Sequence, residues 1–331
     1  MKKVLALLTI TVSLAACVND APSTSDNGKN ETGIRLVTEA NPEWQYENLR
    51  IYPIVADAAV LEKHAALQKL KTLAEGMKTP GFRITELKQF GRVREHSVNA
   101  LTVQNKSDDI IFLMSGDVIT GGNQDRVIAQ DQVVMPGTVK NIEVFCVEKG
   151  RWQFNDETAT ENEKNIFAFK GYYNVASPQV RQAVQRTGSQ SEVWNAVAKV
   201  TSANKAESGT GAYAALETAN EAKAKRDAYL RYFDDKAANV SNMIGMVVVC
   251  GDRVLGVDVF GHPDLFRLKY DALLHGYVAE AATDICTSKL ADDEVERAFA
   301  DVARLAKTEA ASDDVAGKFA LSDGWVHLFR K

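Results

Sequence analysis

The chain has 331 residues, of which 45% are hydrophobic and 25% are charged, and its formal net charge at pH 7 is −5. This composition is typical of a folded globular protein and excludes a fibrous or wholly disordered chain. A net-acidic chain without a basic cluster also argues against nucleic acid as the main partner.

The amino-terminal segment has the pattern of a bacterial export signal. A basic start precedes an apolar run at 4–14, and the tetrapeptide Leu-Ala-Ala-Cys ends at Cys17. The run is too short to span a hydrocarbon core of about 30 Å, but it suits a signal peptide that is removed. The tetrapeptide resembles the lipoprotein cleavage box, in which diacylglycerol joins the Cys thiol and the new amine is then acylated, for example with palmitate. We therefore predict a signal peptide at 1–16 and lipidation of Cys17; an ordinary secreted protein is the alternative.

The predicted anchor leads into a tether and then a folded body. Several acyl chains hold a protein firmly at a bilayer, because each buried methylene contributes about 0.8 kcal/mol. Val18 after the Cys resembles the sorting pattern for the outer membrane, facing the periplasm, if the organism has two membranes. Residues 17–45 are rich in small and polar types, which favours a flexible tether. The globular body is predicted at 46–331, with a β-rich part at 46–152 and a helical and α+β part at 153–331.

The first part of the body is predicted to be mostly β. An apolar run at 49–55 favours a strand, and leucines at helical spacing favour a helix at 57–77. From 82 to 152 the chain alternates in short segments bounded by turn residues. Pro136 and Gly137 predict a tight type II reversal. The predicted β segments lie at 82–87, 98–104, 110–119, 124–129, 133–135 and 139–147.

The rest of the chain is predicted to be helical around one β-hairpin. Ser177 and Pro178 suit the N-cap and first turn of a helix, with a break near Gly188. Because β and α regions are segregated, the expected fold class is α+β, with an antiparallel β unit, a helical middle, and a β-hairpin with C-terminal helices. The later elements are helices at 213–238, 263–285 and 291–306, a hairpin at 243–260 that turns at Gly251-Asp252, and a strand at 325–329.

Three cysteines remain after lipidation. Cys146 and Cys250 stand in apolar strand patterns, which is typical of small buried core residues. Disulfides persist outside the cytoplasm, so a bridge between two of Cys146, Cys250 and Cys286 is the alternative.

The densest cluster of functional groups lies at 116–126. It is not a phosphate loop, because no Gly-Lys-Ser/Thr follows its glycines. If Gly121-Gly122 forms a two-residue hairpin loop, Asp117 falls opposite Arg126. That ion pair would either fix the strand register or form a polar platform on which Arg126 binds an acidic ligand.

The hairpin at 243–260 carries a second candidate, Asp258, which is predicted to lie opposite Gly245. A covered carboxylate there needs a partner or an elevated pKa. His262 could reach it only if the chain turns at Gly261, and a solvated strand end is the alternative. No histidine stands at a metal-binding spacing, and neither a Gly-x-Ser-x-Gly elbow nor a Cys-x-x-Cys is present. We therefore predict no metal site and no cofactor.

These residues together carry a family resemblance. Gly116-Asp117, the run at 121–126, Pro136-Gly137 and the run at 146–152, with further likeness at 190–198 and 254–266, resemble the ARG and rhodanese-phosphatase-superfamily-associated protein domain family. The resemblance spans roughly 49–329 and implies a common body without naming a reaction. The shared polar residues, which we predict to line a common pocket, are Gln124, Arg126, Glu148, Arg151 and Trp152.

The sequence favours a membrane-anchored binding module of the cell envelope. Polar and aromatic groups gather on hairpins, whereas no nucleophile, base and orienting group align for catalysis. The expected partners are the lipid bilayer and a small molecule or envelope protein. The alternatives are an envelope hydrolase acting on a phosphorylated or cell-wall-derived substrate, and a structural scaffold. The candidate binding residues are Asp117, Asn123, Gln124, Arg126, Glu148, Arg151, Trp152 and Asp258.

Overall fold

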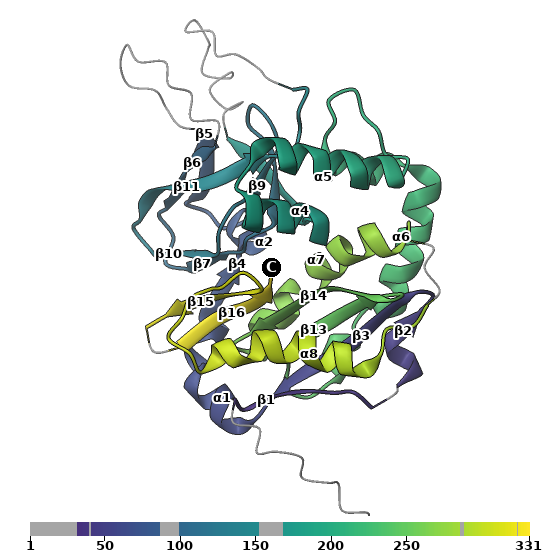
Figure 1. Cartoon of the computed structure of the whole chain (residues 1–331). Coiled ribbons are helices and arrows are strands. Elements are labelled where there is room, and N and C mark those ends of the chain that lie inside the picture. Colours follow the sequence, from purple (N-terminus) through teal and green to yellow (C-terminus); the bar gives the residue numbers. More distant parts are fainter. Residues whose placement is uncertain (1–31, 40, 87–98, 152–167, 285–287, 323) are drawn as a thin grey trace, which may run out of the picture. The chain divides into compact units, whose positions relative to one another are not determined.

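A computed structural model of the chain describes residues 32–331, except 40, 87–98, 152–167, 285–287 and 323. The described residues belong to one unit, Thr32–Lys331, shown in Figure 1. Three sheets with mainly antiparallel pairing combine with several helices, which confirms the α+β class.

The largest sheet has seven strands and a central strand, β13 (Met243–Cys250), that is buried along its whole length. β13 pairs on one side with β3 (Leu49–Ala56) and on the other with β14 (Arg253–Phe260), so strands from the two ends of the chain share this sheet. Further strands extend the sheet beyond β3 on one side and beyond β14 on the other. The other strands are β1 (Ile34–Leu36), β2 (Gln45–Tyr46), β15 (Ala316–Leu321) and β16 (Gly324–Arg330).

Helices cover both faces of this sheet, as Figure 1 shows. The helix α7 (Pro263–Ala281) packs on the face that carries Met246 and Val248. The helix α8 (Asp292–Ala303) packs on the opposite face, with Val247. Because side chains alternate along a strand, a strand covered on both faces must be apolar at every position, as the run at 243–250 is.

A second β layer holds the cluster at 116–126. One sheet has the order β12-β8-β9-β11-β6-β5, and a small sheet has the order β10-β7-β4, in which β4 and β7 are parallel. Apolar side chains from both sheets form a common core. The strands are β4 (Leu70–Thr72), β5 (Phe82–Glu86), β6 (Ala100–Asn105), β7 (Ile110–Leu113), β8 (Asp117–Gly121), β9 (Arg126–Ile128), β10 (Gln132–Val134), β11 (Val139–Cys146) and β12 (Phe169–Val175).

Helices from the middle of the chain cover the outer face of this layer. Val193 and Val197 of α5 (Gln190–Ala203) pack with Val118 and Val127 of the sheet. α4 (Pro178–Gln182) begins at Pro178, and the following π-helical turn (Ala183–Thr187) ends at the left-handed Gly188, so the predicted start and break are confirmed. The remaining helices are α1 (Ala58–Lys63), α2 (Leu73–Gly76) and α6 (Asn220–Phe233), with 3-10 turns at Pro42–Trp44, Ala65–Lys69, Tyr213–Thr218, Lys236–Asn239 and Arg304–Ala306.

Two predicted turns are present. In the hairpin of β13 and β14, Cys250 pairs with Arg253 across the Gly251-Asp252 loop. At the other turn, the Thr138 amide donates to the Met135 carbonyl at 3.2 Å, and Gly137 has a φ of 71°.

The predicted register of the hairpin is wrong by one residue. Asp258 lies opposite Met246, not Gly245, because a bulge between Val248 and Val249 places an extra residue in β14. A bulge leaves no alternation signal in so apolar a run.

Other predicted boundaries also need correction. The predicted helix at 57–77 is split by β4, whose residues pair with β7. The predicted helix at 213–238 begins as a 3-10 turn and becomes α-helical only at Asn220. The ordered body begins before residue 46, because Ile34 and Leu36 of β1 alternate with Arg35 and are buried against the large sheet. Strands β12 and β15 were not predicted.

Cys146 and Cys250 are both buried. The buried-core interpretation is therefore confirmed for these two residues, and they do not form a disulfide with each other. Burial raises the pKa of the Cys146 thiol, which further lowers its reactivity. Cys286 lies outside the described residues.

Candidate functional site

The loop between β8 and β9 is longer than the predicted two-residue turn, and this changes the partner of Asp117. Arg126 lies opposite Ile119, so Asp117 and Arg126 do not face each other. Asp117 is fully buried and instead forms an ion pair with Lys269 of α7. The Tyr172 hydroxyl and the Met114 amide both donate to the same carboxylate, each at 2.9 Å. The predicted cross-strand pair is therefore wrong, and Asp117 joins the second β layer to α7.

Arg126 is also fully buried, and protein groups surround its guanidinium. Nη1 donates to the Gln124 carbonyl at 2.8 Å, and Nη2 lies 3.5 Å from Glu86 Oε1. The same Glu86 oxygen accepts from the Asn123 amide at 2.8 Å. Arg126 thus stabilises the loop from inside and does not present its charge to solvent.

Arg151 and Glu148 close the other side of this loop. Arg151 Nε donates to Glu148 Oε2 at 2.9 Å, and Nη1 donates to the Gly122 carbonyl at 2.9 Å. Nη2 donates to Asp125 at 3.1 Å. Burial acts to raise the pKa of Glu148, but the hydrogen bonds from Arg151, Thr210 and the Asp125 amide outweigh it and lower that pKa. These bonds hold the Glu148 carboxylate ionised as an internal acceptor.

The predicted polar residues therefore do lie close together, but they bind one another and the loop between them. Gln124, Arg126 and Glu148 are each less than 5% exposed, whereas the Arg151 side chain is 28% exposed. Among the described residues, Arg126 Nε and Asn123 Oδ1 have no hydrogen-bond partner, but the rest of the cluster pairs internally. A polar cluster that is closed to water in this way stabilises a loop and leaves little room for a ligand. Trp152 lies outside the described residues.

Asp258 is the centre of a second buried network that joins distant parts of the chain. It receives a bidentate interaction from Arg181 of α4, with Nη1 at 3.0 Å and Nη2 at 2.5 Å. His327 Nε2 of β16 lies 3.1 Å from the same carboxylate, and the Tyr277 hydroxyl of α7 also donates to it. A Cβ at Gly256 would collide with that hydroxyl, so glycine is required there. Burial acts to raise the pKa of Asp258, but the charge of Arg181 and the bonds from His327 and Arg181 outweigh it and lower that pKa.

Neither predicted alternative for Asp258 is correct. Its side chain is fully buried, so the strand end is not solvated. The partner is not His262, whose ring nitrogen accepts from the Asp264 amide at 3.2 Å and caps the start of α7. The distant His327 takes that place, and its other ring nitrogen lies 2.6 Å from Asp131.

His327 provides a prediction about pH. Burial acts to lower its pKa, but Asp131 and Asp258 outweigh this effect and raise the pKa above 6.5, with Arg181 and Tyr277 also facing the network. The stabilisation from protonated His327 should therefore be complete below about pH 6.5 and should be lost as the pH rises through the raised value. We expect the urea-unfolding free energy to fall as the pH rises above about 6.5, and this fall to be smaller in His327→Gln. An equal fall in both proteins would contradict the assignment.

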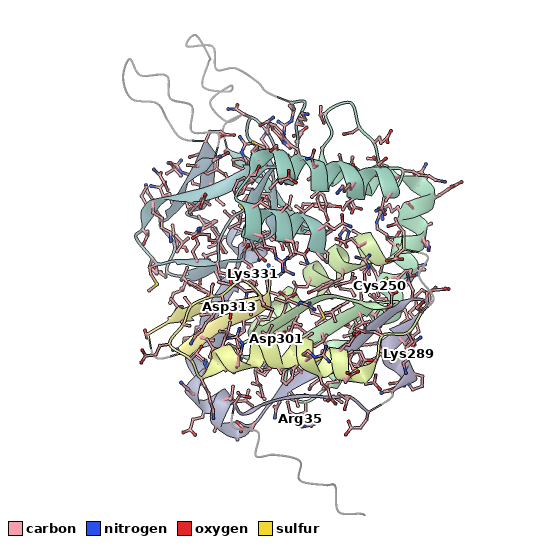
Figure 2. All side chains as sticks on the ribbon, in the orientation of Figure 1. Arg35, Cys250, Lys289, Asp301, Asp313 and Lys331 are labelled. Atoms are coloured by element: carbon pink, nitrogen blue, oxygen red, sulfur yellow. The ribbon has the colours of Figure 1, made fainter. Side chains whose placement is uncertain are left out.

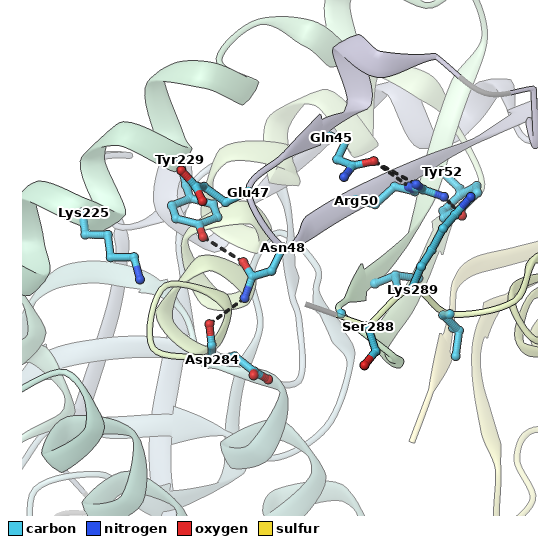
Figure 3. Close-up of a pocket in the computed structure, with 13 residues that line it drawn as sticks. Gln45, Glu47, Asn48, Arg50, Tyr52, Lys225, Tyr229, Asp284, Ser288 and Lys289 are labelled. Atoms are coloured by element: carbon cyan, nitrogen blue, oxygen red, sulfur yellow. Dashed lines mark hydrogen bonds between the residues drawn. The ribbon is translucent and has the colours of Figure 1, made fainter. Parts of the chain in front are cut away.

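An open pocket of about 410 Å³ lies at one end of the large sheet, and it was not predicted from the sequence. Figure 2 shows Cys250, the last residue of β13, and Lys289 toward the same end. Figure 3 shows the lining residues, which come from the β2–β3 turn and the start of β3, from α6, from the end of β13 with its turn, and from the segment after α7. Polar side chains including Asn48, Arg50, Lys225 and Lys289 line it. No local motif marks these residues, because four separate segments bring them together.

Buried charges were missed as well, although a signal exists for two of them. Lys269 lies three residues after Phe266 and four before Leu273, on the apolar stripe of α7. His327 stands inside a strand whose neighbours are all apolar. A charged or titratable residue on a face that must be covered implies a buried partner.

The comparisons agree with the resemblance in the sequence. Residues 38–327 match the ARG and Rhodanese-Phosphatase-superfamily-associated Protein domain. No curated protein and no solved structure gives a significant match. Because the matched region covers most of the chain, the chain belongs to the ARG and Rhodanese-Phosphatase-superfamily-associated Protein domain family.

Proposed function

We propose that this protein is a lipoprotein of the bacterial envelope, anchored through an acylated Cys17, and that its folded body binds a small molecule. The leader and the Leu-Ala-Ala-Cys tetrapeptide support the anchor, at the outer membrane facing the periplasm where the organism has two membranes. Within the described residues, no helix is both long and apolar enough to cross a bilayer.

The pocket at the end of the large sheet is the observation that carries the binding function. Its volume of about 410 Å³ is within the range of small-molecule sites. Lys225, Ser288 and Lys289 on its lining are exposed, so a ligand can reach it from solvent. The clusters around Asp117, Arg126 and Asp258 are closed by comparison.

The acid and base groups of the body favour binding over hydrolysis. A hydrolase needs a carboxylate or imidazole that a substrate can reach. Glu217 is a carboxylate beside a histidine with a side chain 39% exposed, and the hydrogen bond from His275 at 3.0 Å lowers its pKa to about 2. The Tyr173 hydroxyl donates to the same oxygen at 2.8 Å. Glu217 is thus committed to neighbouring side chains as an ionised acceptor.

The anchor predicts the chemistry of the mature amino terminus. Mass spectrometry of protein extracted from cell membranes should find Cys17 as the first residue, with a diacylglycerol thioether and an acylated amine. Cys17→Ser should abolish the lipid and release the protein from the membrane fraction. Intact Met1, or a water-soluble wild-type form without fatty acid, would contradict the anchor.

Binding at the pocket is tested by filling it. The Ser288 side chain is exposed on the lining, so Ser288→Trp should occupy the pocket without disturbing the core. In a thermal-shift screen of a metabolite library, we expect compounds that raise the melting temperature of the wild type and not of Ser288→Trp. Ser191→Trp, at an exposed position on α5, is the matched control. Binding at this pocket is refuted if no compound raises the melting temperature of the wild type, or if the compounds that do so raise that of Ser288→Trp equally. Turnover of a generic ester or phosphate substrate that Ser288→Trp abolishes would favour the hydrolase.

A further inference from the structure

We infer that this pocket selects small organic anions and binds their carboxylate or phosphate oxygens between Arg50, Lys225 and Lys289. The inference rests on the proposed binding function and adds the chemical class of the ligand.

The walls are held by hydrogen bonds that do not depend on a ligand. The Gly251 amide donates to the Asn48 carbonyl at 2.9 Å, and the Leu290 amide donates to the Gly251 carbonyl at 3.1 Å. The Asn48 side chain donates to the carbonyls of Ala281 and Asp284 at 3.1 and 2.7 Å, and its oxygen accepts from Tyr229 at 2.8 Å. Figure 3 shows the bonds that Asn48 makes with Tyr229 and Asp284. A site with fixed walls binds without the cost of ordering them.

Arg50 is oriented by neutral acceptors. Its Nε and Nη2 donate to Gln45 Oε1 at 3.2 and 2.8 Å, and Nη1 donates to the Tyr52 hydroxyl at 2.8 Å, as Figure 3 shows. The nearest described carboxylate, that of Asp292, is 3.9 Å away and 59% exposed. No close carboxylate therefore neutralises the positive charge of the guanidinium. Nη1 and Nη2 each have a further N–H that can bind a ligand. A fixed guanidinium edge matches the geometry of a carboxylate or phosphate.

Two lysines add mobile positive charge. Lys225 of α6 and Lys289 are both exposed, and no carboxylate among the described residues forms an ion pair with either. Their flexible stems allow the ammonium groups to follow ligands of different shape. Arg50, Lys225 and Lys289 come from three separate segments, so the fold and not a local run of basic residues gathers them.

The acidic groups of the pocket do not cancel this charge. Asp284 is held by Arg253 outside the pocket lining, with Nη2 at 2.7 Å and Nε at 3.1 Å. Glu47 is exposed and is the remaining carboxylate of the lining. It stands at the tip of the β2–β3 turn, with a left-handed φ of 52°. Three cations thus face one uncompensated carboxylate, in a chain whose net charge is −5. Local charge of this sign attracts anions and repels cations.

The test uses isothermal titration calorimetry with defined probes on the intact mature body. Citrate and inorganic phosphate represent carboxylate and phosphate anions, glycine a zwitterion, glucose a neutral molecule, and spermidine a cation. We expect citrate, phosphate or both to bind the wild type, and affinity to fall when the Debye length shrinks from about 30 to 8 Å with added salt. The stronger of the two anions identifies the oxyanion.

Charge variants locate the effect. Lys225→Gln combined with Lys289→Gln should weaken anion binding about tenfold or more, because two attractive charges are lost. Lys63→Gln combined with Lys78→Gln, which removes the same charge at exposed positions off the pocket lining, should leave affinity nearly unchanged. Glu47→Gln should strengthen anion binding severalfold, whereas it should weaken the binding of a zwitterion whose amino group meets Glu47.

Each of the remaining outcomes refutes the anion class, the location of the site or the binding function. If glycine, glucose or spermidine binds in preference to both anions, and Ser288→Trp blocks it, the anion class is wrong and the binding function stands. If anions bind but the two lysine pairs behave alike, the site lies elsewhere. If no probe binds and the metabolite screen also fails, the anion inference and the binding function fall together.

Discussion

Replacing Asp258 with alanine is expected to lower the free energy of unfolding by about 3–5 kcal/mol. The change leaves the Arg181 guanidinium, whose side chain is only 7% exposed, without its counter-ion. His327 also loses one of its two carboxylate partners. Removing one partner of a buried pair costs far more than the pair contributes, because the remaining charge stays desolvated. Urea denaturation followed by circular dichroism measures the loss.

The matched control is Asp293→Asn in α8. Asp293 also pairs with an arginine, Arg297 at 3.2 Å, but both side chains are more than 65% exposed. We expect its effect to be within about 0.5 kcal/mol, since surface pairs contribute little. A loss below about 1 kcal/mol in Asp258→Ala would show that water or a rearrangement compensates Arg181, and that the network does not join the two layers.

Local sequence patterns account for much of the fold. The hairpin of β13 and β14, the start of α4 at Pro178 and the apolar stripe of α7 were all predictable, because each depends on residues close together in the chain. The split at 57–77 was not. β4 takes residues of helical spacing into a strand, because its partner β7 lies about forty positions later and offers a ladder. Tertiary pairing of this kind overrides local propensity.

The candidate site was predictable only in part, for a physical reason. Gln124, Arg126, Glu148 and Arg151 were expected to converge, and they do. Polarity in a folded segment indicates a need for hydrogen bonds, and an internal network meets that need as well as a ligand does. The register error followed from treating Gly121-Gly122 as the whole loop, whereas the strands resume pairing only at Ile119 and Arg126. The open pocket has no local signal, because Asn48, Lys225 and Lys289 are far apart in the chain.

Lys269→Met is expected to cost about 3–5 kcal/mol of unfolding free energy, comparable to the loss in Asp258→Ala. Methionine fills much of the space of the lysine, so the loss would come from the uncompensated charge of Asp117 and not from a cavity. The Tyr172 hydroxyl and the Met114 amide would still donate to that carboxylate, but neither carries a formal charge. Thermal and urea unfolding of the single variant measure this cost.

A double-mutant cycle decides what Asp117 does. Adding Asp117→Asn to Lys269→Met removes the buried charge and keeps an acceptor for Tyr172, so the double variant should be more stable than Lys269→Met alone. If the losses of unfolding free energy in the two single variants simply add in the double variant, a charge pair between β8 and α7 is contradicted. If Asp117 instead served a ligand, Asp117→Asn would change binding of the citrate or phosphate probe with little effect on unfolding. The expected result is the reverse, because Asp117 is fully buried and every contact described for it is internal.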